Sequence, residues 1–536
     1  MATTSHRMKL GLNAIIYTVL VGITLVVLNL GGHYLSGRAD LTEDGLYTLS
    51  PVSKNLVKTL PADLKIRVFV SKKLVAGLDE VRQYVIDKLK DYAEASNGRF
   101  KWEIVYPEES EEAKKLTEQY RIPKFDAQTA RSGSKESREI YFGMSLSYKA
   151  PKAEKEEIEV LPVLGWNIQQ NLEYLLTERI HRLVKGRKKI LIVTGHDEAP
   201  AQQVDGLVKA LNRFFQNYRV EQYNIRGGEP VPQDAQVLLI IPPNTPWTEP
   251  DKQKLNAFLM QGKGALFLLE GMAVQKQRQQ FQMQQMPTIM MPAEHGLNDL
   301  LGKWGIQVQG NFVMDEGQQP LMIRQGNQAQ VIFHPALLNI WVSRHLKAPV
   351  TPMLASSLEL TAAFVGQQIQ PGKSFRVQPL LVTSEKAWTV TGPYVPNLQR
   401  RDRPPDNAKR GRYVVGALVE GKLPSAFPGQ GPKESGANSR AVIIGDFDIL
   451  ARLGTVAGNQ VFLQNLVDWL AQDEALVKLR NKQMQERAMI LPEAKGKRVL
   501  LQIALIVGLP LLLIAFGVIR WQLRVSRRQA AARALD

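Results

Sequence analysis

Two long apolar runs near the ends of the sequence constrain the fold more than any other feature. Leu10–Leu30 and Val499–Ile519 contain no Asp, Glu, Lys or Arg. At about 1.5 Å of rise per residue, a helix over either run spans the roughly 30 Å hydrocarbon core of a bilayer. Pro510 does not argue against this, because transmembrane helices tolerate proline. The sequence therefore predicts transmembrane helices at 10–34 and 499–519.

A cleaved signal peptide is the alternative for the first run. A signal peptide has a shorter apolar core and small residues at its cleavage site. Here the run is long, and the segment GGHYLSGRADL that follows it has no A-x-A pattern. These features favour an uncleaved membrane anchor.

The flanking positive charges predict the orientation of both helices. Arg7 and Lys9 precede the first run, and five arginines follow the second: Arg520, Arg524, Arg527, Arg528 and Arg533. The opposite orientation is favoured, but more weakly, by three positive charges before the second run: Lys495, Lys497 and Arg498. Because cytoplasmic flanks are rich in Lys and Arg, we expect both termini in the cytoplasm and residues 31–498 outside it. The absence of cysteine suits an oxidising compartment.

The formal net charge of +17 raises the question of an anionic partner. Outside the cytoplasm such a partner would be membrane lipid, an anionic envelope polymer or an acidic protein, and no nucleic acid is expected. The densest basic stretches are Arg179–Lys189 and Arg400–Arg412. The simpler interpretation of these stretches is a solvated basic surface.

Between the apolar runs, strands alternate with helices, which predicts an α/β fold with a largely parallel sheet covered on both faces. An amphipathic helix at 168–183, ending at Gly186, separates a small α/β domain from a larger one. We expect a surface loop at the Gln/Met-rich stretch 275–292 and poorly periodic structure at 391–438. The predicted organisation is a cytoplasmic stub (1–9), a transmembrane helix (10–34), a membrane-proximal α/β domain (35–185), a larger α/β domain (186–475), a stalk (476–498), a second transmembrane helix (499–519) and a basic cytoplasmic tail (520–536).

The best candidate site follows the strand Ile190–Thr194, where the sequence continues with Gly195, His196, Asp197 and Glu198. Open α/β sheets bind ligands at the carboxyl ends of their strands, so these residues could contact a ligand or partner. The alternative is a structural turn, in which Gly195 permits the bend and a carboxylate caps the next helix. In that case, replacing His196 or Glu198 would cost about 0.5–2 kcal/mol.

Asp446 and Asp448 form a second candidate at the end of the strand in SRAVIIGDFDIL. Their spacing places both side chains on one side of an extended strand. A role in a turn or helix cap is favoured over cation binding.

Several classes of chemistry lack their usual residues. The chain has no cysteine nucleophile, no G-x-S-x-G elbow and no H-E-x-x-H zinc motif. The segment GQQIQPGKS at Gly366–Ser374 nearly matches a phosphate-binding loop, but it has one residue too many and precedes a predicted strand at 376–384 instead of a helix. We therefore expect no catalytic residues, no metal site and no cofactor.

Six features in order resemble one family. They are an N-terminal span, D-L-T-x-D-x-x-Y-T-L-S at Asp40–Ser50, T-G-H-x-E at Thr194–Glu198, L-L-I-I-P-P at Leu238–Pro243, G-D-F-D at Gly445–Asp448, and N-x-x-F-x-x-N-x-x-D-W-L at Asn459–Leu470 before a C-terminal span. Together they resemble the Gldg family, auxiliary subunits of ABC-type transport systems first associated with bacterial gliding motility. Where that family often has Gly between His and Glu, this chain has Asp197.

The resemblance implies a location and partners. It implies a bacterial inner-membrane protein with a large periplasmic portion, a larger domain similar to class I glutamine amidotransferases, and a separate ABC permease and ABC ATPase as partners. It implies an auxiliary role, either binding cargo or coupling the transporter to the envelope, and not an enzyme. The alternative is a membrane-tethered periplasmic hydrolase or glycan-active enzyme built on the same sheet.

Overall fold

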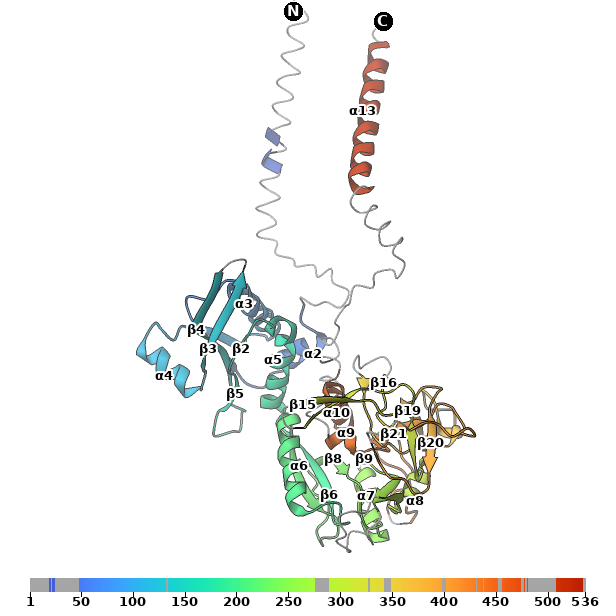
Figure 1. Cartoon of the computed structure of the whole chain (residues 1–536). Coiled ribbons are helices and arrows are strands. Elements are labelled where there is room, and N and C mark those ends of the chain that lie inside the picture. The colour runs from blue at the N-terminus through green and yellow to red at the C-terminus, as the bar shows by residue number, and fades with distance from the viewer. Residues whose placement is uncertain are drawn as a thin grey trace, which may run out of the picture. The chain divides into compact units, whose positions relative to one another are not determined.

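The structure is a computed structural model of the whole chain. It describes residues 19–20, 22–24, 48–131, 134–274, 289–325, 328–341, 349–397, 402–429, 431–436, 438–451, 456–473, 477, 480 and 508–533. The chain divides into two compact units, Met1–Met484 and Gln485–Asp536. The first unit contains two lobes built on separate sheets (Figure 1). We call residues 48–185 the first lobe and residues 187–473 the second lobe.

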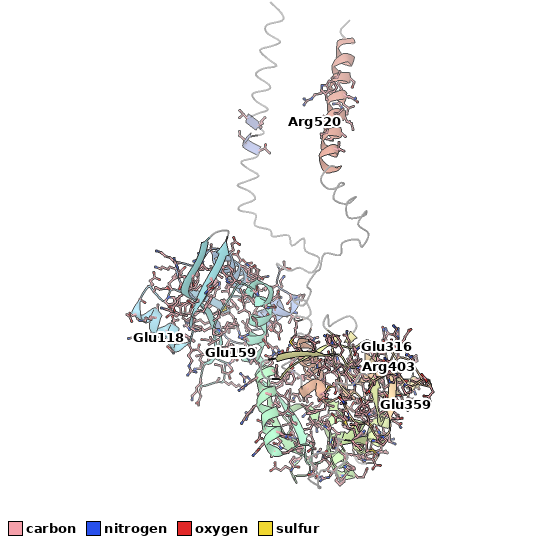
Figure 2. The ribbon with its side chains drawn as sticks, viewed as in Figure 1. Glu118, Glu159, Glu316, Glu359, Arg403 and Arg520 are labelled. Atoms are coloured by element: carbon pink, nitrogen blue, oxygen red, sulfur yellow. The ribbon has the colours of Figure 1, made fainter. Side chains whose placement is uncertain are left out.

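The two predicted transmembrane helices are not confirmed. Among the described residues, no helix combines the length and the apolar character needed to cross a membrane. The span predicted at 10–34 lies outside the described residues except at 19–20 and 22–24. The span predicted at 499–519 is described only from residue 508, and α13 (Leu509–Arg533) continues past Arg520 (Figure 2) into the basic tail. The predicted stalk at 476–498 is described only at residues 477 and 480.

The first lobe is a five-stranded sheet with helices packed on it. Its elements are α2 (Pro51–Lys58), β1 (Leu64–Val70), α3 (Leu78–Ala95), β2 (Phe100–Val105), α4 (Glu111–Gln119), β3 (Lys124–Arg131), β4 (Ser134–Tyr148), β5 (Glu157–Leu161) and α5 (Ile168–Lys185). The strand order is β2-β1-β4-β3, and β5 also pairs with β4. Strands β4 and β5 form a hairpin, in which Tyr148 pairs antiparallel with Glu157. Strand β3 was not expected.

Helix α5 shows why its sequence forms a buried helix. Leu172, Leu176 and Ile180 recur every four residues, lie on one face and are fully buried in the core of the first lobe. Gly186 follows with a φ of +74°, a left-handed conformation that glycine adopts readily at the end of a helix. The helix predicted at 168–183 is therefore confirmed, with its end at Lys185.

The second lobe is built on a nine-stranded sheet in the order β12-β18-β21-β22-β9-β8-β6-β7, with β19 paired to β21. Its main elements are β6 (Lys188–Thr194), α6 (Ala201–Phe214), β7 (Tyr218–Asn224), β8 (Ala235–Ile240), α7 (Glu249–Leu259), β9 (Gly264–Leu268), α8 (Asn298–Gly302), β12 (Ile306–Val308), β18 (Leu358–Leu360), β19 (Phe375–Val382), β21 (Val414–Gly421), β22 (Ser439–Ile444), α9 (Asp448–Ala451) and α10 (Ala457–Leu470). Smaller pieces outside this sheet are β10 (Met272–Val274), β11 (Met290–Pro292), β13 (Asn311–Met314), β14 (Leu321–Gln325), β15 (Gln328–Ile332), β16 (Ile340–Trp341), β17 (Pro349–Val350), η2 (Ala362–Phe364) and β20 (Trp388–Thr391).

Strand β6 lies inside the sheet, and its side chains enter two cores. Ile190 and Ile192 pack in a cluster with residues of α6 and α10, whereas Leu191 and Val193 pack in a cluster with residues of α7. Side chains alternate between the faces of a strand, so a continuous apolar run is what a strand buried on both faces requires. Helices therefore cover both faces of the sheet, and the mixed α/β prediction is confirmed.

The prediction of a largely parallel sheet is only partly correct. Strands β22, β9, β8, β6 and β7 are parallel to one another, but β21, β18, β12 and β19 pair antiparallel. The region 391–438, expected to be poorly periodic, contributes β21 to the interior of the sheet. Of the loop expected at 275–292, residues 275–288 lie outside the described part and 290–292 form β11.

Candidate functional site

The candidate residues after β6 lie at the point where the winding of the sheet reverses. From β6 the chain crosses to β7 on one side, and it then returns to form β8 and β9 on the other side. The loops that leave β6 and β8 therefore diverge at the carboxyl ends of two neighbouring parallel strands. Open α/β sheets place ligands in the crevice at such a point. Gly195, His196, Asp197 and Glu198 follow β6 directly, so the sheet puts them at that edge.

A tight turn begins at Gly195. Its φ is +128°, and a Cβ atom there would lie 2.8 Å from the Asn224 side-chain oxygen. Glycine is therefore required by conformation and by space. Asp197 also has a positive φ, +54°, which Asp tolerates better than most residues. The expected bend is confirmed, and it leaves the Asp197 side chain exposed.

His196 points into the protein. Its imidazole has 0% exposure and stacks on the indole of Trp247, with ring centroids 4.5 Å apart and planes 11° apart. Its Nε2 atom lies 3.2 Å from Oδ2 of Asp251, which also accepts the Thr248 hydroxyl at 2.6 Å. Its Nδ1 atom lies 3.5 Å from Oε1 of Glu198 and has no hydrogen-bond partner among the described residues. The ring is held by its surroundings and does not face solvent.

Glu198 closes the turn on itself. Its Oε2 atom accepts a hydrogen bond from the amide of Gly195 at 3.1 Å, and Oε1 accepts one from the amide of His196 at 3.0 Å. Burial alone would raise the pKa of Glu198, but the adjacent His196 side chain and the backbone amides that donate to the carboxylate outweigh it, and the pKa lies below its usual value. The expectation that a carboxylate of this turn caps the next helix is wrong, because α6 begins after Pro200 without a side-chain cap.

The loop after β8 hydrogen-bonds to the loop after β6 at this edge. The amides of Asn244 and Thr245 donate to the His196 carbonyl at 2.9 and 3.0 Å. The Asn244 side-chain amide also donates to the carbonyls of Asp197 and Glu198. The loops that follow β6 and β8 are thus joined by hydrogen bonds at the edge where open α/β sheets bind ligands. We call His196, Glu198, Asn244, Trp247 and Asp251 the switch-point cluster.

Asp446 and Asp448 lie at the same edge of the sheet but not in the switch-point cluster. Strand β22 ends at Ile444, so the expected alternation of the two aspartates along a strand is wrong. Asp446 instead accepts the amides of Asp448 at 2.9 Å, Ile449 at 3.1 Å and Met353 at 3.3 Å. Two of these amides open α9, so Asp446 caps that helix. In the strand order, β9 and β8 separate β22 from β6.

A third carboxylate joins this second group. Burial, together with the charge of Asp448, raises the pKa of Glu270 to about 7. Burial, followed by the charges of Asp448 and Glu270, raises the pKa of Asp446 well above its ordinary value. The described residues include no cluster of three or more His, Cys, Asp or Glu that could hold a metal ion. Glu270 and Asp446 therefore hold their protons at a higher pH than exposed carboxylates do, because burial and neighbouring negative charges disfavour ionisation.

Sequence reasoning missed Asn244, Trp247, Asp251 and Glu270. The spacing of Thr248 and Asp251 is typical of a capping box at the start of a helix, which is a partial signal for Asp251. Thr248 does precede α7, but its hydroxyl bonds the Asp251 carboxylate and no side-chain cap forms. The partners of His196 come from another βα loop, and no sequence pattern pairs them.

The near-match to a phosphate-binding loop has no phosphate-binding geometry. Gly366–Ser374 leads into strand β19, as expected, and not into a helix. The Lys373 Nζ atom lies 4.9 Å from the centre of the Phe364 ring. Without a helix N-terminus behind it, the segment lacks the aligned amides that hold phosphate.

Comparison with known families supplies an independent finding. A family model described as "ABC-type uncharacterized transport system" matches residues 187–471. A second model, described only as a domain of unknown function, matches residues 43–147. No curated protein matches the chain.

Two solved structures show weak similarity. The mmIFT52 N-terminal domain is 13% identical with a TM-score of 0.30, over 53% of this chain and 96% of that chain. The exo-beta-1,4-mannosidase Op5Man5 from Opitutaceae bacterium strain TAV5 is 10% identical with a TM-score of 0.22, over 59% of this chain and 43% of that chain. At these TM-scores neither likeness carries an argument about fold or function.

Proposed function

The chain belongs to the family described as ABC-type uncharacterized transport system, whose members are auxiliary components, and from that membership we propose a membrane-anchored, non-enzymatic subunit of the Gldg type. Its partners would be a separate ABC permease and a separate ABC ATPase. The five sequence motifs and the two flanking apolar runs that resemble the Gldg family support this finer assignment. The permease would move the substrate and the ATPase would supply the energy, and this chain would bind cargo or couple the transporter to the envelope.

The closed switch point is the observation that carries the non-enzymatic role. A hydrolase needs a nucleophile or an activated water together with a base that can reach the substrate. His196 is the histidine that follows β6 at this edge, and its imidazole is fully buried between Trp247, Asp251 and Glu198. The chain also contains no cysteine. The edge is therefore suited to recognition through exposed groups such as Asp197.

Membrane anchoring is part of the proposal and rests on the sequence. The two apolar runs and their flanking charges support two spans in a bacterial inner membrane, with both termini in the cytoplasm and the lobes in the periplasm. Single cysteines can test this, because the native chain has none. Ser110→Cys and Lys433→Cys lie at exposed positions and should react with a membrane-impermeant thiol reagent in intact spheroplasts, whereas Ala531→Cys should not. If only Ala531→Cys were labelled, the orientation would be the reverse of the one proposed.

The subunit role is tested by purification. The tagged full-length chain, extracted from native membranes in mild detergent, should bring down a permease and an ATPase encoded nearby. The purified chain alone should hydrolyse no ATP. The matched control is the same preparation from cells that lack the permease gene, in which the ATPase should no longer be recovered.

One result would overturn the non-enzymatic role. It is turnover of an ester, amide or glycan by the purified chain, abolished by His196→Ala or Glu198→Gln at conditions where the folded fraction is unchanged. Recovery of the chain without any transporter subunit would instead overturn the proposed partnership.

A further inference from the structure

Helix α5 receives polar contacts from the two segments that flank the lobes. One segment enters the first lobe at Ser50, and the other follows the second lobe and includes Arg480. Their contacts on α5 fall on consecutive residues, Glu173 and Tyr174. Consecutive positions on a helix point about 100° apart, so the two segments hold different sides of the helix.

The first contact joins the start of α2 to α5. Oε1 of Glu173 accepts the Ser50 amide at 2.6 Å and the Ser53 hydroxyl at 2.8 Å. Ser53 also contacts the Thr177 hydroxyl one turn further along α5, at 2.8 Å. All four residues are buried, with Glu173 at 7% exposure. A buried carboxylate at the N-terminus of a helix is stabilised by the amides that it accepts.

The second contact joins residue 480 to both lobes. The Arg480 guanidinium donates to the Tyr174 hydroxyl of α5 at 2.9 Å and lies over its ring, 5.3 Å from the centre. The same group donates to Asp468 of α10 at 2.8 Å and to Asn465 of α10. The side chain of Arg480 is 8% exposed and that of Asp468 is 2% exposed. A single buried arginine therefore bridges a helix of the first lobe and a helix of the second.

Further contacts along α5 reinforce the joint. Glu178 accepts the Asn217 side-chain amide at 2.9 Å, and His181 lies 3.7 Å from Asp473. On the other side of Asp468, the Tyr218 hydroxyl of β7 donates to its carboxylate at 2.6 Å. The first two pairs join α5 of the first lobe to the second lobe, and the third joins α10 to β7 within the second lobe.

The joint should open cooperatively. If Arg480 left its site, Asp468 would remain buried as a charge without its cation, which is costly in a low-dielectric interior. The Tyr174 hydroxyl would lose its donor at the same time. Breaking only some of the Arg480 contacts therefore brings no gain in free energy, so these contacts should break together.

We propose that α5 is a common brace, to which the segments before and after the lobes are clamped at Glu173 and Tyr174, and that Arg480 fixes the two lobes relative to each other. A displacement of either flanking segment would then change the position of one lobe against the other. The brace does not depend on the proposed transport role; only its use during transport does.

The second clamp is tested by the distance between the lobes in the full-length chain in detergent. Spin labels at Glu118→Cys on the first lobe and Glu359→Cys on the second occupy exposed positions (Figure 2). Arg480→Met should broaden a narrow distance distribution, and Tyr174→Phe, which removes only the bridging hydroxyl, should broaden it less. The double variant should be no broader than Arg480→Met, because both changes break the same contact.

Arg440→Met is the matched control. Arg440 is also buried, donates to the Trp469 carbonyl at 2.7 Å and stacks on the Trp469 ring at 4.8 Å, and these contacts lie within the second lobe. Arg440→Met should leave the distribution of distances between the two spin labels unchanged. Arg480→Met and Tyr174→Phe distributions as narrow as that of the control would overturn the brace. If Arg480→Met fails to fold, Tyr174→Phe alone decides the question.

The first clamp is tested by thiol access at Leu49→Cys, whose native side chain is 4% exposed. Glu173→Met leaves the Ser50 amide without its acceptor, so labelling at position 49 should accelerate by about tenfold. Glu118→Met, at an exposed position on α4 (Figure 2), is the control and should not accelerate it. Equal labelling rates in both variants would show that Glu173 does not hold the entering segment. Neither experiment needs a transporter partner, so its failure is distinct from failure of the proposed function.

Discussion

Replacing Glu270 with glutamine should make the protein more stable, and the gain should grow with pH. Burial and the charge of Asp448 raise the pKa of Glu270 to about 7, from an ordinary value of 4.5. Below pH 4.5 the carboxyl is protonated in the folded and unfolded chains alike, so it contributes no pH dependence. Between pH 4.5 and 7 the unfolded chain releases the proton while the folded chain keeps it, and the free energy of unfolding falls.

The magnitude follows from the same pKa values. The gap between 4.5 and about 7, at about 1.4 kcal/mol for each pKa unit, gives an upper limit of about 3 kcal/mol above pH 7. Glutamine resembles the protonated acid and cannot ionise, so Glu270→Gln should recover most of that energy at pH 8 and none at pH 4.5. Solvent reaching the partly exposed side chain lowers the gain, and Asp446 still titrates nearby.

Thermal melts of the full-length chain in detergent at several pH values measure the effect. The gap in Tm between Glu270→Gln and the native chain should widen from pH 5 to pH 8 and reach roughly 2–6 °C. Glu359→Gln, at an exposed position on β18, should show one small offset at every pH. A gap for Glu270→Gln that is constant with pH, or a variant less stable than the native chain at pH 8, would refute the reasoning.

Three other predictions follow from burial and backbone geometry. His196→Ala should lower the free energy of unfolding by about 2–4 kcal/mol in denaturant titration, because it removes a fully buried ring and leaves Asp251 short of a partner; a loss under 1 kcal/mol would mean that the ring is not packed as described. Gly271→Ala should cost more than about 3 kcal/mol or prevent folding of the second lobe, since the new Cβ would lie 1.9 Å from the Gln309 carbonyl oxygen, whereas Gly206→Ala on α6 meets nothing within 4 Å and should stabilise by about 0.5–1 kcal/mol. Lys373→Ala should leave the ATPase activity of the assembled complex unchanged, and a large loss with the complex intact would restore the phosphate-loop hypothesis.

Periodicity was a good guide to elements whose burial shows in the sequence. The run Ile190–Thr194 is apolar throughout because β6 is covered on both faces, and the stripe from Ile168 to Leu183 marks the buried face of α5. Strand β21 escaped prediction. Gly416 is needed in this strand because a Cβ atom there would come within 2.9 Å of Leu381. The segments around β21 are also rich in Pro and Gly. A glycine selected for close packing looks the same in a sequence as one selected for a turn.

The candidate site was located by the sequence, but its character was not. The order of strands and helices was enough to put His196 at the carboxyl edge of the sheet. Whether its ring faces solvent depends on Trp247 and Asp251, which come from a different βα unit. Contacts of that kind are set by tertiary packing, so neither residue carries a local signal. The loss of unfolding free energy expected for His196→Ala is therefore that of a removed core side chain, which is larger than that of a removed helix cap.

The pairing of β22 with β9 governs how the second lobe can fold. Leu268 and Ile444 are register partners in the middle of the sheet, although 176 positions of sequence separate them. Contacts of such long range are slow to form, because the intervening chain loses its entropy before the pairing repays it. During synthesis, β9 remains an unpaired apolar edge strand until residue 444 has left the ribosome. Unpaired edge strands of this kind are where aggregation begins. A chain shortened from its C-terminus past β22 should therefore not yield a smaller soluble second lobe, and a chaperone that covers the β9 edge would be needed most in that interval.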